Sequence, residues 1–254
     1  MKHLAYKKIG KGFPIVLIHG YLGGPLMWQF QIEVLKNDYE VIIPCLAGYA
    51  ESASLKAPNS INENAELILE LLDHLKINNL YLLGHSMGGM IVQEIAAMNS
   101  KEVKKLICCG TGPIGALPSR FETIDQTRKK ILNLGLKSVR EEIAKTWFVD
   151  YETSKEYLIC LEEGKKATEQ AALASLNAWE KWDGRKQLSK INCPTLIIWS
   201  DKDKSYDWEQ QKALKQGIKH SEIVVIKDCA HNAHMEKPKK FNEIMLDFIN
   251  NKTL

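Results

Sequence analysis

The stretch Leu80-Tyr81-Leu82-Leu83-Gly84-His85-Ser86-Met87-Gly88-Gly89 decides the fold of this 254-residue chain. An apolar run of strand length ends at Gly84, and a buried helical pattern follows Gly89, from Met90 to Met98. A Gly-x-Ser-x-Gly pattern between a strand and a helix predicts a sharp turn that lifts Ser86 above the edge of a sheet. The free N–H groups at the start of the helix favour a developing oxyanion there. The alternative, a glycine-rich turn that holds a serine by chance, does not account for the strand-to-helix context.

Short apolar runs alternate with longer helical patterns on both sides of this stretch. Continuous apolar strands are typical of a parallel sheet that is covered on both faces. Alternation of strands and helices with short connections predicts an α/β fold with a doubly wound, mostly parallel sheet. Strands are expected at 15–18, 41–43, 80–83, 103–109, 195–199 and 223–226, with an edge strand near 3–8, and helices at 62–75, 90–98, 208–214 and 241–249.

One long stretch interrupts this alternation. Between about Gly112 and Leu188 only helical patterns occur, such as 123–134, 139–148 and 167–179, and strands resume after Cys193-Pro194. The sequence therefore predicts an all-helical cap at residues 112–188, inserted into a core made of residues 1–111 and 189–254. The cap is rich in aromatic residues, of which one or two are expected to face a pocket: Trp147, Phe148, Tyr151, Tyr157, Trp179 and Trp182.

Composition excludes several classes of protein. Hydrophobic residues make up 45% and charged residues 26%, as in ordinary globular domains. The net charge of +3, from 34 basic and 31 acidic residues, is too balanced to indicate a nucleic-acid or anionic-membrane partner. No apolar run approaches the roughly 18 residues of a membrane span, and the first residues lack a signal-peptide pattern. We therefore expect a cytoplasmic protein, either a monomer or a homodimer.

The six cysteines do not form a metal-binding pattern. None belongs to a pair of C-x-x-C motifs, so a zinc site is not expected. In a cytoplasmic chain of this size the thiols are expected to stay reduced, as small core residues. We expect neither a metal nor an organic cofactor.

Several segments together resemble the α/β-hydrolase superfamily, and the resemblance covers nearly the whole chain. The 84–89 turn is similar to the family's nucleophile elbow. The other matching segments, in the family's order, are Ile18-His19-Gly20-Tyr21, Trp28 with Gln31 and Leu35, the strand and turn from Pro194 to Asp203, and Ala230-His231 followed by Glu236 and Pro238.

The resemblance implies a catalytic triad in the order Ser, acid, His. A serine needs a base within hydrogen-bond reach, and the base needs an acid that orients it. Of seven histidines, only His220, His231 and His234 follow the resumed sheet, and His231 has the family's small residue before it. His234 is the main rival. Alignment with the family's Gly-x-x-Asp turn places the acid at Asp203, although Ser200 replaces the glycine here. Asp201 remains an alternative, and Asp207 and Asp228 are less well placed.

The resemblance also implies an oxyanion hole, and this chain differs from the family's pattern at one turn. The two donors would be the backbone N–H groups of Met87 and Tyr21, while His19 would hold the loop by hydrogen bonding. The Tyr21 side chain would either point into the pocket or pack as a core aromatic. The family's Asp-x-x-Gly-x-Gly turn has Cys45 at the Asp position and Ala50 at a Gly position. We interpret Cys45 as structural, because it lacks the geometry of the elbow.

The implied activity is cleavage of a small carboxylic ester or lactone through an acyl-enzyme intermediate. The same scaffold supports hydrolysis of carbon–carbon, thioester or amide bonds, perhydrolysis and lyase chemistry, and fold alone does not separate these. A serine at position 86 disfavours the dehalogenase and epoxide-hydrolase branch, whose nucleophile is Asp. A small-ligand receptor that retains the triad is the alternative from a different class.

Overall fold

A seven-stranded, mostly parallel sheet forms the centre of the molecule. The computed structural model describes residues 3–98, 102–116 and 120–251. The strand order is β1-β3-β2-β4-β5-β6-β7, and every neighbouring pair is parallel except β1 with β3. The strands are β1 (Tyr6–Ile9), β2 (Phe13–Ile18), β3 (Tyr39–Pro44), β4 (Leu80–His85), β5 (Val103–Cys109), β6 (Thr195–Ser200) and β7 (Ser221–Ile226).

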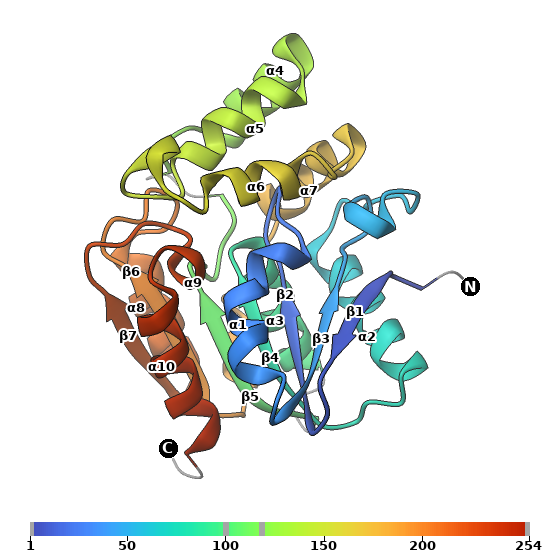
Figure 1. Ribbon diagram of the computed structural model, residues 1–254, viewed down its shortest axis with the longest axis vertical. Helices are drawn as coiled ribbons and strands as arrows, with labels where there is room; N and C mark the ends of the chain where they lie inside the picture. Colours follow the sequence, from blue (N-terminus) through green and yellow to red (C-terminus); the bar gives the residue numbers. More distant parts are fainter. Residues whose placement is uncertain (1–2, 99–101, 117–119, 252–254) are drawn as a thin grey trace.

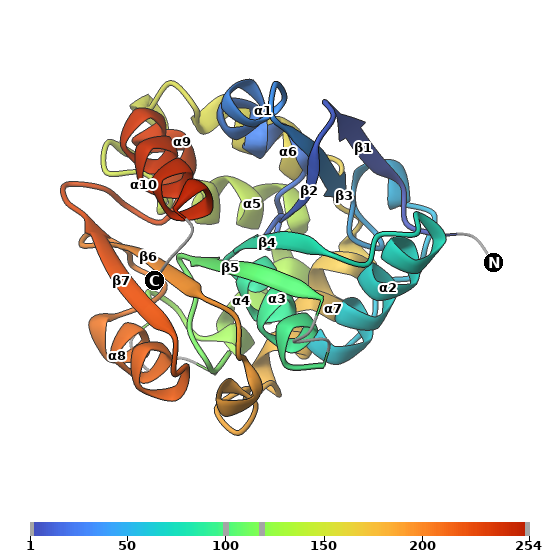
Figure 2. The same cartoon turned by 90° about the horizontal axis from the view of Figure 1, so that it is seen from below.

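Helices cover both faces of the sheet, which explains why its central strands are apolar without alternation. Figure 2 shows α1 (Gln29–Leu35) and α10 (Pro238–Asn250) on one face. On the other face lie α2 (Ile61–His74), α3 (Met87–Met98) and α8 (Trp208–Gly217). Each face has its own buried hydrophobic cluster. The predicted doubly wound sheet, including the edge strand near the N-terminus, is therefore confirmed.

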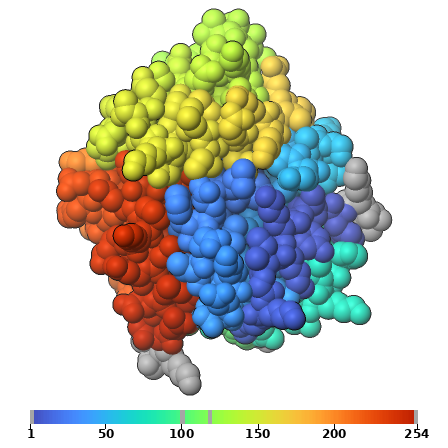
Figure 3. Space-filling model, in the orientation of Figure 1, coloured from blue at the N-terminus to red at the C-terminus, as the bar shows by residue number. Residues whose placement is uncertain are grey.

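The chain between β5 and β6 leaves the sheet and forms a helical layer over one end of it (Figure 1). Its helices are α4 (Ile124–Leu134), α5 (Leu136–Lys145), α6 (Tyr157–Gly164) and α7 (Glu169–Glu180). On the face shown in Figure 3 the atoms of this cap lie directly against those of the core. The inserted helical cap is confirmed as part of the fold, while its limits at residues 112 and 188 stay a prediction.

The sequence pattern missed one cap helix and misplaced another. The apolar spacing predicted a helix at 139–148, but α5 begins at Leu136 and ends at Lys145. Helix α6 was not predicted, because it is only 8 residues long and no side chain caps its N-terminus. Its place is set instead by burial of Tyr157 and Cys160.

Hydrogen bonds from buried side chains hold the cap on the core. The Trp182 indole donates to Glu94 Oε1 at 2.7 Å, and the hydroxyls of Tyr49 and Ser175 lie 2.8 Å apart. Glu163 Oε2 accepts from the backbone N–H of Leu26 at 2.9 Å. All of these side chains are buried, so each lost bond would leave an unpaired polar group inside the protein. The cap is thus docked in a defined position.

No helix within residues 3–98, 102–116 and 120–251 is both long enough and apolar enough to cross a membrane.

A line of aromatic rings, each tilted against the next, runs through the interior at the end of the sheet nearest the cap. His234 lies between Trp28 and His85, with 4.6 Å from its ring centre to each of theirs, and His85 lies equally close to His231. Neither ring nitrogen of the fully buried His234 has a hydrogen-bond partner among the described residues. Burial lowers the pKa of His234 to about 3 and that of His85 well below its usual value, and the charges of the neighbouring histidines add a weaker effect in the same direction.

These neutral histidines make stability depend on pH. An unfolded histidine titrates near pH 6.5, so between that pH and about 3 the unfolded chain binds one more proton at His234 than the folded chain does. The contribution of His234 is complete above pH 6.5 and is lost as the pH falls. We expect His234→Phe to reduce the loss of unfolding free energy between pH 7 and pH 5 by about 2 kcal/mol.

Urea unfolding at pH 7, 6 and 5 measures this difference. His220→Asn, at an exposed turn, is the matched control and should keep the pH dependence of the wild type. An identical decline in wild type and His234→Phe would show that His234 is not the group responsible.

Candidate active site

Ser86 sits at the turn between β4 and α3 in a strained backbone conformation. Its φ angle is 55°, in the left-handed region that residues other than glycine rarely adopt. The turn requires very close backbone contacts: a Cβ atom at Gly84 would lie 2.2 Å from the carbonyl oxygen of Gly88. A Cβ at Gly88 would lie 2.3 Å from the carbonyl oxygen of Ile18. Both glycines of the motif are therefore required by packing.

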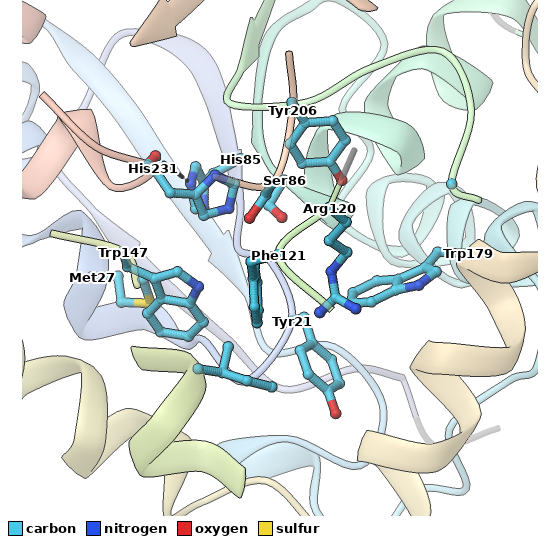
Figure 4. A pocket seen from close by; sticks show the side chains of 13 residues that line it. Tyr21, Met27, His85, Ser86, Arg120, Phe121, Trp147, Trp179, Tyr206 and His231 are labelled. Atoms are coloured by element: carbon cyan, nitrogen blue, oxygen red, sulfur yellow. Dashed lines mark hydrogen bonds between the residues drawn. The ribbon is translucent and has the colours of Figure 1, made fainter. Parts of the chain in front are cut away.

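The backbone of Ser86 is held by hydrogen bonds with β5, with the segment that follows β5 and with the first turn of α3. Its N–H donates to the carbonyl of Cys109 at 2.9 Å, and its carbonyl accepts from the Thr111 hydroxyl at 2.8 Å. The N–H of Gly89 donates to the same carbonyl at 2.9 Å. With the backbone held in this way, the side chain of Ser86 lines a pocket beneath the cap (Figure 4).

His231 and Asp203 form a hydrogen-bonded pair beside this pocket. His231 Nδ1 lies 2.9 Å from Asp203 Oδ2, and the Asp203 side chain is fully buried. Asp203 Oδ1 accepts from the backbone N–H groups of Ser205 and Tyr206, at 2.7 and 3.3 Å. A carboxylate only accepts, so Nδ1 carries the proton and Nε2 is left as an acceptor. His231 lines the same pocket as Ser86.

The rival residues lie elsewhere. His234 lies behind His85 and does not line the Ser86 pocket. Asp201 Oδ2 is 3.9 Å from Lys227 Nζ at the surface, and its Oδ1 is buried without a partner among the described residues. Three predicted residues, Ser86, Asp203 and His231, are thus brought together, whereas the alternatives are not.

The two predicted oxyanion donors flank the elbow. Met87 is the first residue of α3, where a helix N–H has no acceptor one turn earlier. Tyr21 follows β2 in the loop beside Ser86, and its ring lies edge-on to Trp179 with 4.8 Å between centres. His19 holds this loop as expected: Nδ1 donates to the Gly20 carbonyl at 2.9 Å, and Nε2 accepts from the N–H of Leu46 at 3.2 Å.

Core and cap both contribute side chains to the pocket, whose volume is about 30 Å³ for water-sized guests. The pocket is therefore narrow. Of the cap aromatics, Trp147 and Trp179 line the pocket, as the sequence analysis expected for one or two of them. Several other lining residues were not predicted from the sequence, among them Arg120, Phe121 and Tyr206.

Tyr206 contacts both the nucleophile and the base. Its ring is nearly parallel to that of His231, at 16° and 5.8 Å between centres. Burial raises the pKa of the Tyr206 hydroxyl, and its hydrogen bonds with Ser86 and Thr111 oppose this rise. Its position three residues after Asp203, in the turn that presents the acid, is the sequence signal that points to it.

The cysteines are not part of the pocket. All six are buried and carry free thiols. The Cys45 thiol donates to Glu51 Oε2 at 3.1 Å, and burial, together with this carboxylate, raises its pKa to about 12. Within the described residues no group of three or more His, Cys, Asp or Glu side chains is arranged to hold a metal ion.

Known proteins resemble this chain over almost its full length. A 2-hydroxy-6-oxononadienedioate/2-hydroxy-6-oxononatrienedioate hydrolase of Pseudomonas putida is 28% identical and matches 97% of this chain and 91% of its own. A bromoperoxidase structure from Bacillus anthracis has a TM-score of 0.90 at 27% identity, covering 97% of this chain and 95% of its own. An esterase structure from Thermogutta terrifontis has a TM-score of 0.84 at 26% identity, covering 97% and 93%.

The pattern of the alpha/beta hydrolase family matches residues 15–244. This range begins in β2 and ends in α10, so it includes the elbow, the strand before Asp203 and the loop of His231. The chain therefore belongs to the α/β hydrolase family.

Proposed function

We propose that the protein is a serine hydrolase that cleaves a small carboxylic ester or lactone through an acyl-enzyme intermediate. The observation that carries this proposal is the strained Ser86 in one pocket with His231, whose Nδ1 is paired with the buried Asp203. A serine, a base and an acid in this arrangement are the parts of a nucleophilic triad.

In the acylation step, Ser86 Oγ attacks the carbonyl carbon while its proton passes to His231 Nε2. Asp203 stabilises the imidazolium that forms, because its carboxylate already accepts from Nδ1. The backbone N–H groups of Met87 and Tyr21 hold the oxyanion. The alcohol then leaves with the proton from Nε2, and in a lactone it remains tethered to the acyl group.

In the deacylation step, His231 Nε2 takes a proton from water, which attacks the acyl carbon. Ser86 leaves as the alkoxide and recovers the proton from His231, and the carboxylic acid is released. The narrow pocket supports a small substrate with an apolar part, because Ile143 and Trp147 of the cap and Met27 of the core form an apolar wall. No step needs a metal or an organic cofactor.

Hydrolysis of a carbon–carbon bond is the second candidate. The observation in its favour is the Pseudomonas putida relative, which is named for such a substrate class and matches 97% of this chain. The same Ser86 and His231 would serve, with a carbon leaving group in place of an alcohol. A panel that contains simple esters, lactones and 1,3-diketones separates the two, because only the favoured class should give the high kcat/KM.

The nucleophile is tested by replacing Ser86. Wild type should react with a fluorophosphonate probe and hydrolyse p-nitrophenyl acetate and butyrate. Ser86→Ala should do neither, because it removes the hydroxyl at the elbow that the proposal makes the nucleophile; the expected loss in kcat is on the order of 10⁶-fold. Ser138→Ala, on the exposed face of α5, is the matched control and should behave as wild type. A wild type that neither binds the probe nor turns over any ester would favour a small-ligand receptor.

The acid is tested by comparing two neighbouring carboxylates. Asp203→Asn should lower kcat for p-nitrophenyl butyrate by about 10³–10⁴-fold, because an amide no longer holds His231 in the required tautomer. Asp201→Asn should keep activity near that of wild type, since Asp201 faces Lys227 instead. The opposite pattern, with Asp201→Asn inactive and Asp203→Asn active, would refute the assignment.

A further inference from the structure

The pocket contains a cation that the triad does not use. Arg120 lies in the segment that leads into α4, and its partly buried side chain lines the pocket together with Ser86 (Figure 4). Its charge acts on the hydroxyls of both Tyr206 and Tyr21, whose pKa values it lowers against the larger effect of burial. The guanidinium group is therefore close enough to the reaction centre to meet a bound substrate.

Among the described residues Arg120 forms no ion pair with a carboxylate, although the charge of Glu122 raises its pKa against the larger effect of burial. Its Nη1 donates to two neutral acceptors, the Glu122 carbonyl at 3.2 Å and the Thr127 hydroxyl at 3.4 Å. The nearby Glu122 carboxylate is occupied by other donors: it accepts from the Thr127 hydroxyl at 2.5 Å and pairs with Lys130 at 2.8 Å. Neither Nε nor Nη2 of Arg120 has a hydrogen-bond partner within residues 3–98, 102–116 and 120–251.

Two aromatic rings hold the guanidinium group in place. Its central carbon is 4.8 Å from the centre of the Phe121 ring and 5.1 Å from that of Trp179 (Figure 4). Aromatic contacts of this kind attract the cation and limit its hydration, while the edges of the planar group stay available. The edges of a guanidinium group match a carboxylate, which accepts two parallel hydrogen bonds from it.

We propose that Arg120 binds a carboxylate of the substrate, so that the protein acts on esters or lactones that carry a second, free acid group. This inference rests on the proposed function for the position of the reacting carbonyl at Ser86. It concerns a separate part of the pocket, however, and can be tested by binding alone. A purely structural Arg120, which only anchors the start of α4 through Glu122 and Thr127, makes no distinction between charged and neutral substrates.

Matched pairs of substrates reveal the subsite. Mono-p-nitrophenyl succinate, glutarate and adipate are compared with the p-nitrophenyl esters of the neutral acyl chains of equal length. Wild type should prefer at least one hemi-ester in kcat/KM. Arg120→Gln should lower this preference by about 10- to 100-fold, the range expected for a charge-assisted hydrogen bond.

Two control variants separate charge, geometry and cap stability. Arg120→Lys keeps the positive charge but not the two-pronged edge, so part of the preference should remain. Arg128→Gln, on α4, removes a cap arginine that is already paired with Glu180 and should keep the full preference of wild type. If Arg120→Gln does not fold, the substrate preference of wild type and its partial retention in Arg120→Lys decide the question.

Binding of free dicarboxylates tests the subsite without catalysis. Calorimetric titration with succinate, glutarate and adipate should show weaker binding to Arg120→Gln than to wild type by a similar factor, whereas butyrate should not discriminate. This result would stand even if no ester were hydrolysed, in which case the proposed function fails and the subsite does not. A wild type without preference for any hemi-ester, together with equal dicarboxylate affinities for wild type and Arg120→Gln, would overturn the inference.

Discussion

The close backbone contact at the turn from β4 into α3 is the constraint on which the rest of the structure depends. It brings the carbonyl of Gly88 so near to Gly84, and the carbonyl of Ile18 so near to Gly88, that neither position tolerates a side chain. The strained backbone conformation of Ser86 is stabilised by hydrogen bonds with Cys109 of β5 and with Thr111. Because α3 packs against the sheet at this point, the same contact sets the direction of the helix and the exposure of the Ser86 side chain.

The remaining polar groups of the site come from strands whose ends meet at one edge of the sheet. Asp203 follows β6, and its carboxylate is held by two N–H groups of its own turn. His231 follows β7 and reaches back to that carboxylate. In parallel sheets the carboxyl ends of all strands share an edge, so residues far apart in sequence converge without long connections. The cap covers this edge, and the pocket lies between the cap and the core.

The cap also supplies chemistry that the core lacks. Trp147 and Trp179 provide apolar surface, while Arg120 places a positive charge among aromatic rings. Bringing such a charge into a pocket costs hydration energy unless a partner compensates it. The proposed carboxylate of the substrate would be that partner. Under these proposals the cap segment would set the specificity, and residues at the edge of the sheet would carry out the reaction.

The sequence by itself determined the sheet, the elbow and the short list of triad candidates, because these depend on local patterns: apolar strands, glycine spacing and the position of a polar residue after a strand. It left His234 beside His231 and Asp201 beside Asp203, since neighbours in sequence share the same local signals. Only the tertiary structure distinguishes their positions: the His234 ring packs at a tilt against Trp28, whereas His231 pairs with Asp203. Likewise Arg120, Phe121 and Tyr206 line the pocket through contacts between segments that are distant in sequence. The spacing of apolar residues along the chain does not predict such contacts.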